Sequence, residues 1–439
     1  MTNTSTQTSL RAWALIPFFV FLFFYLGCSI LMKDFSAIPM PVAFLVASAV
    51  ALFQNRTRTL QDKIDSFAQG MGELNIMLMC LIFILAGIFS AVAKEMNAID
   101  SAVILTRTLI PDHLLLVGMF SIACLVSLAI GTSCGTIATL VPLALELAAS
   151  VHLSPEWMLS AVVGGAMFGD NMSIISDTTI AATRTQGIPM HEKFVTNFSF
   201  AFPAVIATVV VYAFFSPSIT LVDQLRAITL TDIILVLPYL VVLILSLCRF
   251  NVIALLFFGI LFAAIIGLTC QQFDSSLTLF KAMQEGLLGM SETMMVALLA
   301  GGMMALVRYN GGIAYILTVI GRRIASTRAC EYCVALLIAL VNLFTANNTV
   351  AIVMTGPIAK ELSQTHGCSP RRIASILDAT SCVVQGFIPY GAQLLIVAGL
   401  VQLAQGELSI FKLITHLYYQ HFLLLALLLF IWFKPRKHS

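Results

Sequence analysis

The sequence contains few charged residues. Asp, Glu, Lys and Arg together make up 10% of its 439 residues, whereas a soluble globular protein carries about 25%. So few charges cannot cover a water-facing surface of this size, which excludes a soluble protein. Hydrophobic residues make up 59%, so lipid must cover much of the surface. The formal net charge of +2 gives no basis for nucleic-acid binding.

Clustered metal ligands and catalytic side chains are also missing. The ten cysteines are scattered singly through apolar segments, apart from Cys330 and Cys333. These two have the spacing of half a zinc site, but no second pair completes it. No nucleophile lies in a recognisable set with a general base. We therefore expect neither an enzyme nor a resident cofactor; the only bound ions we expect are transported ones.

Apolar runs near the length of a membrane-crossing helix recur from end to end of the chain. A β-barrel would show short alternating segments instead. The first run has no convincing small-residue cleavage site after it, so we interpret it as a retained span. The sequence predicts an all-α polytopic membrane protein. Its apolar runs are Trp13–Leu31, Gly72–Val92, Phe198–Phe215, Ile233–Leu247, Val252–Leu268, Met290–Val307 and Phe411–Phe433.

The chain resembles itself at an offset of 215 residues. Without gaps, Ile137–Ser160 and Ile352–Ser375 share eight identities in 24 positions, where composition alone gives roughly two. The shared Ser-Pro steps, Ser154-Pro155 and Ser369-Pro370, carry most weight, because proline at a helix start is not freely exchanged. We interpret the chain as two repeats, residues 1–220 and 221–439.

Each predicted repeat has the same order of elements. Three spans precede a short amphipathic helix, a helix pair joined by a polar break, an interrupted helix and a last span. Whether the pair is re-entrant or fully crossing, the number of crossings is odd, so the second repeat is inverted. We expect about ten spanning helices, two re-entrant helical hairpins and two interrupted helices. The amphipathic helices are Ile99–Ile110 and Ile313–Ile324, the hairpins 113–150 and 331–365, the interrupted helices 155–188 and 370–404, and the last spans 198–216 and 411–433.

Basic residues are distributed unevenly among the predicted loops. With the amino terminus in the cytoplasm, 17 of the 23 Lys and Arg residues, Lys63, Lys193 and Arg372 among them, fall in cytoplasmic segments. Positive charge marks the cytoplasmic side of membrane proteins. The sequence thus predicts a multi-pass protein of the bacterial inner (plasma) membrane with both termini in the cytoplasm.

Four polar segments interrupt the apolar helices, at 131–136, 169–179, 345–349 and 385–393. At the offset of 215 the first pairs with the third and the second with the fourth. Gly and Pro let a helix unwind, and free backbone groups at membrane depth are tolerated only beside a cavity or a ligand. We therefore expect the four breaks to meet near the repeat interface and to hold a cation.

Aspartates in or near these breaks are the first candidates, because a carboxylate in the membrane is expensive and usually functional. Asp170 opens the second break, so we expect it to carry Na⁺ or a proton; capping of the next half-helix is its alternative role. For Asp177 the alternative is a helix N-cap, and for Asp378 a bond to a backbone or amide group. Polar groups of the other breaks either bind the ion or link helices. The predicted ion- and substrate-binding residues are Asp170, Asn171, Ser173, Ser176, Asp177, Thr178, Thr132, Ser133, Thr136, Asn347, Asn348, Thr349, Asp378, Gln385, Tyr390 and Gln393, with Asp170, Thr132 and Ser133 as Na⁺ ligands.

These motifs resemble those of the NhaC-type sodium/proton antiporter family, within the broad ion-transporter superfamily. The resemblance implies paired re-entrant hairpins, with Na⁺ held at tips formed by Thr132-Ser133 and Asn347-Asn348-Thr349, and an elevator-like motion. It rests on Gly131-Thr132-Ser133 followed by Gly135-Thr136-Ile137-Ala138-Thr139, and on Phe168-Gly169-Asp170 followed by Ser173 and Ser176-Asp177-Thr178-Thr179.

The chain departs from this family at two positions. Family members often have Lys or His where this chain has Asn171, and commonly proline where it has Ile174. Loss of a basic neighbour changes the proton affinity of a carboxylate, so the resemblance alone does not fix how Asp170 handles protons.

Two functions fit these features. The first is a Na⁺/H⁺ antiporter that works by alternating access. The alternative is a Na⁺-coupled transporter or exchanger of a small organic solute, a carboxylate or amino acid, because Asn347, Asn348, Gln385, Gln393 and Tyr390 offer neutral polar groups. A channel or membrane enzyme fits broken helices at a repeat interface less well. Expected partners are Na⁺, H⁺, membrane lipid, the solute of the alternative and, by analogy with the superfamily, a second copy in a homodimer.

Overall fold

The computed structural model describes residues 12–27, 39–55, 57–214, 227–248, 250–273, 275–320 and 326–433. The predicted repeat boundary at 220 and the end of the first apolar run lie outside these residues. All described regular elements are helical, so the predicted all-α fold is confirmed. The described residues contain eight helical segments long and apolar enough to cross a membrane, besides shorter apolar helices. The number of crossings stays a prediction.

The helices of the first half follow the predicted order, with one addition. A polar helix, α4, precedes the long apolar helix α5. Hydropathy alone does not reveal α4 because many of its residues are polar and exposed. The elements are η1 (Ala12–Leu15), α1 (Ile16–Leu22), η2 (Phe23–Gly27), α3 (Met40–Phe53), α4 (Leu60–Met71), α5 (Leu74–Glu95), α6 (Ala98–Leu109), η3 (Asp112–Leu114), α7 (Leu115–Ile130), α8 (Ser133–Ser150), α9 (Pro155–Met172), α10 (Asp177–Gln186) and α11 (Met190–Phe214).

The second half repeats this series. Both bounds of α9, shifted by 215, are those of α19, and α14 is the counterpart of α4. The last element differs, because two helices, α21 and α22, stand where the first half has α11. The elements are α12 (Leu230–Leu247), α13 (Val252–Thr269), α14 (Ser276–Gly289), α15 (Ser291–Tyr309), α16 (Gly312–Ile320), α17 (Thr327–Thr345), α18 (Asn348–His366), α19 (Pro370–Phe387), α20 (Ala392–Leu403), α21 (Ile410–Thr415) and α22 (Tyr418–Trp432).

Contacts between the halves are exchanged in the way a two-fold relationship requires. Helix α5 packs on α14, and their counterparts α15 and α4 pack on each other. Likewise α8 packs on α20, while α18 packs on α10. The broken helices α9–α10 and α19–α20 are thus placed against the hairpin helices of both halves, which brings the polar breaks together in the interior.

Glycine allows helices of the two halves to approach closely. A Cβ atom added to Gly286 of α14 would collide with the backbone of Gly87 on α5, and one added to Gly301 of α15 would lie 2.9 Å from the carbonyl oxygen of Gly70. Small residues permit such contact between membrane helices, where dispersion forces replace the hydrophobic effect. Gly286 and Gly301 are therefore packing residues.

The turns of the two hairpins have the same backbone conformation. Gly131 after α7 and Ala346 after α17 both adopt the left-handed region, with φ of 77° and 48°. Glycine adopts it freely, whereas a residue with a Cβ pays roughly 1–2 kcal/mol. The side-chain oxygen of Asn347 then accepts a hydrogen bond of 3.0 Å from the Val350 N–H and caps α18. Each turn thus presents the amino terminus of a half-helix to the interior.

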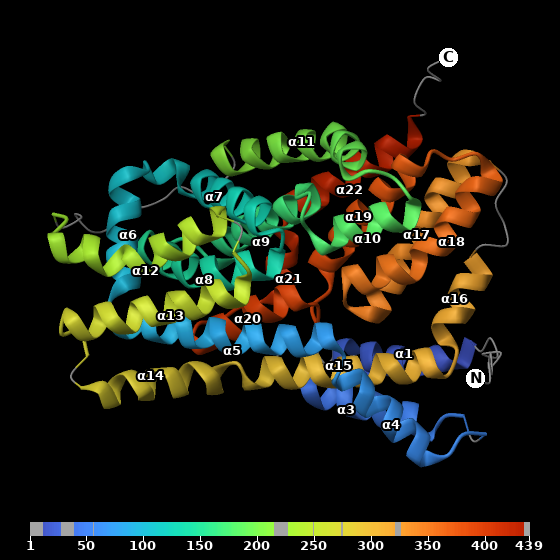
Figure 1. The fold of residues 1–439 in the computed structure, drawn as a ribbon, viewed down its shortest axis with the longest axis horizontal. Coiled ribbons are helices and arrows are strands. Elements are labelled where there is room, and N and C mark those ends of the chain that lie inside the picture. The colour runs from blue at the N-terminus through green and yellow to red at the C-terminus, as the bar shows by residue number, and fades with distance from the viewer. Residues whose placement is uncertain are drawn as a thin grey trace.

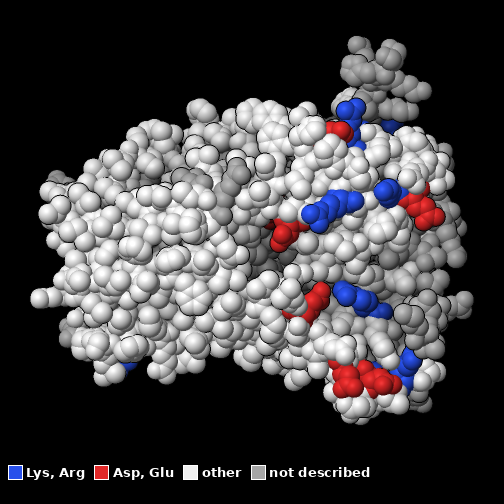
Figure 2. Space-filling view, viewed as in Figure 1, with Lys and Arg blue, Asp and Glu red and all other residues white. Residues whose placement is uncertain are grey.

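Charged side chains gather at one end of the molecule on the face shown in Figure 2. The beginning of η1 and the end of α22 lie at that same end (Figure 1). However, three basic residues assigned to cytoplasmic segments are buried in the protein: Lys63, Lys193 and Arg372. Counting Lys and Arg residues in predicted loops does not reveal their burial, because the count does not show whether a basic side chain binds a partner inside the protein. The orientation of the termini stays a prediction.

Candidate functional site

Asp170 lies buried in the last turn of α9, with 4% of its surface exposed. The Ser133 hydroxyl, in the first turn of α8, donates to its Oδ2 at 2.7 Å. The Ser176 hydroxyl, which caps α10, donates to its Oδ1 at 2.5 Å. Helix amino termini carry partial positive charge and favour an anion. The sequence-predicted neighbours Ser133, Asp170 and Ser176 therefore form one cluster, which we call the Asp170 centre.

The second half reaches this centre through two amides. Gln393, near the start of α20, donates to the Ser133 hydroxyl at 3.0 Å. Gln385, near the end of α19, donates to the Gln393 side-chain oxygen at 3.0 Å and to the Ala346 carbonyl at 2.9 Å. A continuous hydrogen-bonded chain thus runs from the second hairpin turn to the Asp170 carboxylate. This chain links all four predicted breaks, and the first break enters it at Ser133.

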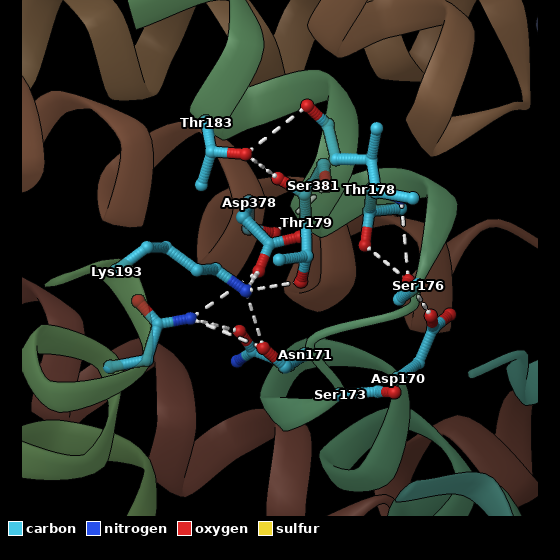
Figure 3. Close-up of polar contacts among 12 residues, drawn as sticks. Asp170, Asn171, Ser173, Ser176, Thr178, Thr179, Thr183, Lys193, Asp378 and Ser381 are labelled. Atoms are coloured by element: carbon cyan, nitrogen blue, oxygen red, sulfur yellow. Dashed lines mark hydrogen bonds and ion pairs between the residues drawn. The ribbon is translucent and has the colours of Figure 1, made fainter. Parts of the chain in front are cut away.

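A second polar centre lies beside the first, and we call it the Lys193 centre. The Lys193 ammonium group forms an ion pair with Asp378, and donates to the Asn171 carbonyl at 2.6 Å and the Thr179 hydroxyl at 2.7 Å (Figure 3). The Asn197 amide donates to the Asn171 side-chain oxygen at 2.6 Å and to Asp378 at 3.3 Å. A buried ion pair needs such additional hydrogen bonds to offset desolvation.

Lys193 and Asn197 are functional candidates that the sequence analysis missed. The last span was expected to begin at residue 198, but α11 begins at Met190, so Lys193 belongs to a helix rather than a loop. Their spacing of four residues places both side chains on one face of α11. That spacing is the only sequence signal. The hydropathy of the segment conceals it, because Lys193 directly follows His191 and Glu192, a polar stretch that resembles a loop.

Other first-half candidates make contacts within their own half. The Thr136 hydroxyl donates to the Thr132 carbonyl at 3.1 Å, and the Ser173 hydroxyl to the Leu128 carbonyl at 3.0 Å. The Thr178 hydroxyl lies 2.9 Å from that of Ser176. Asp177 is exposed at the first residue of α10, and Ser176 is the N-cap there. The N-cap interpretation of Asp177 is therefore wrong, because the preceding residue has the required extended backbone.

The remaining second-half candidates are held mainly by contacts within their own half. The Asn348 side-chain oxygen accepts a bond of 3.0 Å from the Thr349 N–H, and Tyr390 donates to the Leu343 carbonyl at 2.8 Å. The Tyr390 ring packs edge-on against Phe21 and Phe44. A cavity of about 20 Å³, room for one water molecule, separates Asn347 and Thr345 from Glu73 and Arg308. The tip formed by Asn347, Asn348 and Thr349 therefore lies beside α5 and α15 and does not contact Asp170 directly.

The two centres are close in space. Asp378 lies near enough to Asp170 to interact with it electrostatically. In the described part of the chain, no group of three His, Cys, Asp or Glu side chains is placed to hold a metal ion. The oxygens of the Asp170 centre, two from a carboxylate and two from hydroxyls, are hard ligands, which suit hard cations such as Na⁺.

Comparison with known proteins places these features in a family. The model of the Na⁺/H⁺ antiporter family matches residues 5–216 and 219–432. The Na⁺/H⁺ antiporter NhaC of Bacillus subtilis (strain 168) is 25% identical over 401 residues, 83% of this chain and 86% of that relative. An uncharacterized Na⁺/H⁺ antiporter of Haemophilus influenzae (strain ATCC 51907 / DSM 11121 / KW20 / Rd) is 20% identical over 332 residues, 68% of this chain and 71% of the relative.

Two solved transporter structures are also similar. MtrF of Neisseria gonorrhoeae, from a class of antimetabolite efflux pumps, is 14% identical with a TM-score of 0.42, covering 89% of this chain and 92% of that chain. The YdaH transporter of Alcanivorax borkumensis is 14% identical with a TM-score of 0.41, covering 80% of this chain and 84% of that chain.

The family match includes both polar centres. Asp170, Ser133 and Lys193 lie in its first stretch, and Asp378 and Gln393 in its second. The resemblance to NhaC-type antiporters, based on the motifs around Ser133 and Asp170, is confirmed. The chain belongs to the Na⁺/H⁺ antiporter family.

Proposed function

We propose that the protein exchanges Na⁺ for H⁺ across the bacterial plasma membrane, and that Asp170 holds the two cations in turn. The observation that carries the proposal is the burial of Asp170 between two serine hydroxyls, Ser133 and Ser176, at the amino termini of α8 and α10. Both ions compete for the same carboxylate, so binding of one requires release of the other.

The hydroxyl groups allow the centre to adapt to either cation. In the structure, Ser133 and Ser176 donate to the carboxylate oxygens. Each hydroxyl oxygen also carries lone pairs, so rotation about the C–O bond turns a donor into a ligand. Na⁺ would then be held by oxygens of Asp170, Ser133 and Ser176, while a proton would bind one Asp170 oxygen. Thr132, placed in the turn before Ser133, is proposed as a contributor.

Alternating access is proposed to come from two inverted repeats, residues 1–220 and 221–439. The shared helix bounds of α9 and α19 and the exchanged contacts of α5 and α15 support this. The family match in two separate stretches, one per half, supports it too. Cytoplasmic termini are proposed from the charged end of the molecule, where both chain ends of the described residues lie (Figures 1 and 2).

The organic-solute alternative has less support from the contacts. Gln385 and Gln393 bind each other, and Gln393 also binds Ser133. Tyr390 donates to the Leu343 carbonyl, and the Asn347 side-chain oxygen accepts from the Val350 N–H. Most of the neutral polar groups that suggested a solute therefore already form internal hydrogen bonds, which a solute would have to break.

The test uses purified protein in lipid vesicles with a pH-sensitive dye inside. An inward Na⁺ gradient should drive proton exit from the vesicles, and Asp170→Asn should abolish it because an amide takes up no proton and has no negative charge to attract Na⁺. Asp65→Asn, the same substitution on the exposed surface of α4, is the matched control and should retain exchange. Na⁺-driven proton movement in Asp170→Asn would refute the assigned role. Flux that requires an added carboxylate or amino acid would favour the alternative.

A further inference from the structure

The buried charges around Asp170 do not cancel. On the described parts of α8, α9, α10, α11 and α19, three buried acidic or basic side chains lie in the interior: Asp170, Lys193 and Asp378. The other two buried charges on these helices lie near helix starts with partners of their own, Glu156 with Lys412 and Arg372 with Glu331. With every group ionised, the two neighbouring centres carry one net negative charge.

Lys193 is surrounded as an ammonium ion should be. Its three N–H bonds match three acceptors, which are Asp378, the Asn171 carbonyl and the Thr179 hydroxyl. A neutral amine has only two hydrogens, so loss of the proton would leave an acceptor without a donor. It would also leave the Asp378 carboxylate without its counter-charge in a medium of low dielectric constant. The geometry therefore retains the charge on Lys193.

Asp378 depends on Lys193 for compensation. Its Oδ2 accepts from Lys193 and Asn197, while its Oδ1 is buried and accepts no hydrogen bond. Asp170 differs, because its two oxygens accept from serine hydroxyls, and no basic side chain in the described residues forms an ion pair with it. The uncompensated negative charge is thus located on Asp170.

We propose that Lys193 is a fixed internal counter-charge for Asp378, so that the protein moves one Na⁺ in one direction and one H⁺ in the other. This inference rests on the proposed function and adds its stoichiometry. The Na⁺-loaded centre holds Asp170 with Na⁺ and the Asp378–Lys193 pair, and the protonated centre holds neutral Asp170 with the same pair. Both states are neutral, so no net charge crosses the membrane in a cycle.

The first test measures whether exchange responds to voltage. Vesicles containing the full chain receive a K⁺ gradient and valinomycin, which set an inside-negative or inside-positive potential. The initial rate of Na⁺-driven proton movement should be the same under both potentials and under none. A rate that changes with the potential would refute the proposal that Lys193 is a fixed counter-charge, but it would not refute Na⁺/H⁺ exchange itself. Absence of any Na⁺-driven proton movement would instead refute the proposed function.

The second test changes the number of buried charges. Lys193→Gln removes the positive charge, so the two centres gain one further net negative charge. Asp378→Asn removes one negative charge, so the two centres become neutral. Each variant leaves a buried charge without its partner and should lower the exchange rate by about tenfold or more. The double variant Lys193→Gln/Asp378→Asn restores one net negative charge and should recover voltage-independent exchange. Thermal unfolding of each purified variant separates loss of fold from loss of transport. A folded double variant without exchange would overturn the proposal; if it does not fold, the voltage test on the unmodified protein decides.

Discussion

Gln393 on α20 donates a hydrogen bond of 3.0 Å to the hydroxyl of Ser133 on α8, although the two residues are 260 positions apart in the sequence. Ser133 in turn donates to the Asp170 carboxylate. The second half of the chain therefore orients a group that touches the proposed cation-binding carboxylate. Movement of α20 relative to α8 would break the bond that orients the Ser133 hydroxyl beside Asp170.

Removal of the Gln393 amide should weaken Na⁺ binding without removing Asp170. In Gln393→Leu the Ser133 hydroxyl loses its donor and is free to rotate, so we expect the half-saturating Na⁺ concentration to rise about fivefold, equivalent to roughly 1 kcal/mol. Gln402→Leu, the same change at an exposed position of α20, is the control. Na⁺-dependent exchange rates measured over a range of concentrations test this. Equal Na⁺ dependence of the two variants would contradict it.

Loss of either serine hydroxyl should have a larger effect. Ser133→Ala and Ser176→Ala each remove a bond to a buried carboxylate, worth roughly 1.5 kcal/mol or about tenfold in Na⁺ affinity. The control is Ser121→Ala, because the Ser121 hydroxyl bonds only to the Val117 carbonyl of its own helix. Calorimetric Na⁺ titration of the purified protein gives the affinities directly. A tenfold loss in Ser121→Ala as well would show that the effect is not local.

The two aspartates of the α9–α10 break should behave differently. Asp177 is exposed, whereas Asp170 is buried and bonded to Ser133 and Ser176. We expect Asp177→Asn to keep exchange within about threefold of the unmodified rate, since an exposed charge is screened by solvent. The vesicle assay, run side by side with Asp170→Asn, makes the comparison. Complete loss of exchange in Asp177→Asn would show that Asp177, and not Asp170 alone, is essential for exchange.

The ion pair between Arg372 and Glu331 should support stability rather than transport. Arg372 binds both Glu331 oxygens at 2.7 Å and the Phe430 carbonyl at 2.8 Å, which joins α17, α19 and α22. Arg372→Met leaves a buried carboxylate without its partner and should lower stability by about 3–5 kcal/mol. The double variant with Glu331→Gln should recover part of that loss. Thermal unfolding of both tests this, and an unchanged midpoint in Arg372→Met would contradict it.

Much of the Asp170 centre was predictable from local sequence. Ser133, Asp170 and Ser176 occur in polar breaks within apolar helices, and membrane energetics allows such breaks only where a ligand or a cavity is present. The role of Asp177 was not predictable, because exposure depends on how the following helix is oriented and not on residue type.

The sequence by itself determined that the chain is helical and lies in a membrane, since too few charges remain to cover a water-facing surface. The internal similarity at an offset of 215 residues and the positions of the polar breaks are likewise properties of the sequence, because glycine, proline and polar residues act on the backbone near them. Only the tertiary structure decided that Lys193 compensates Asp378 and that Gln393 binds Ser133. A buried charge is stabilised by the partner that packing places next to it, and the choice of partner depends on which helices are neighbours in space.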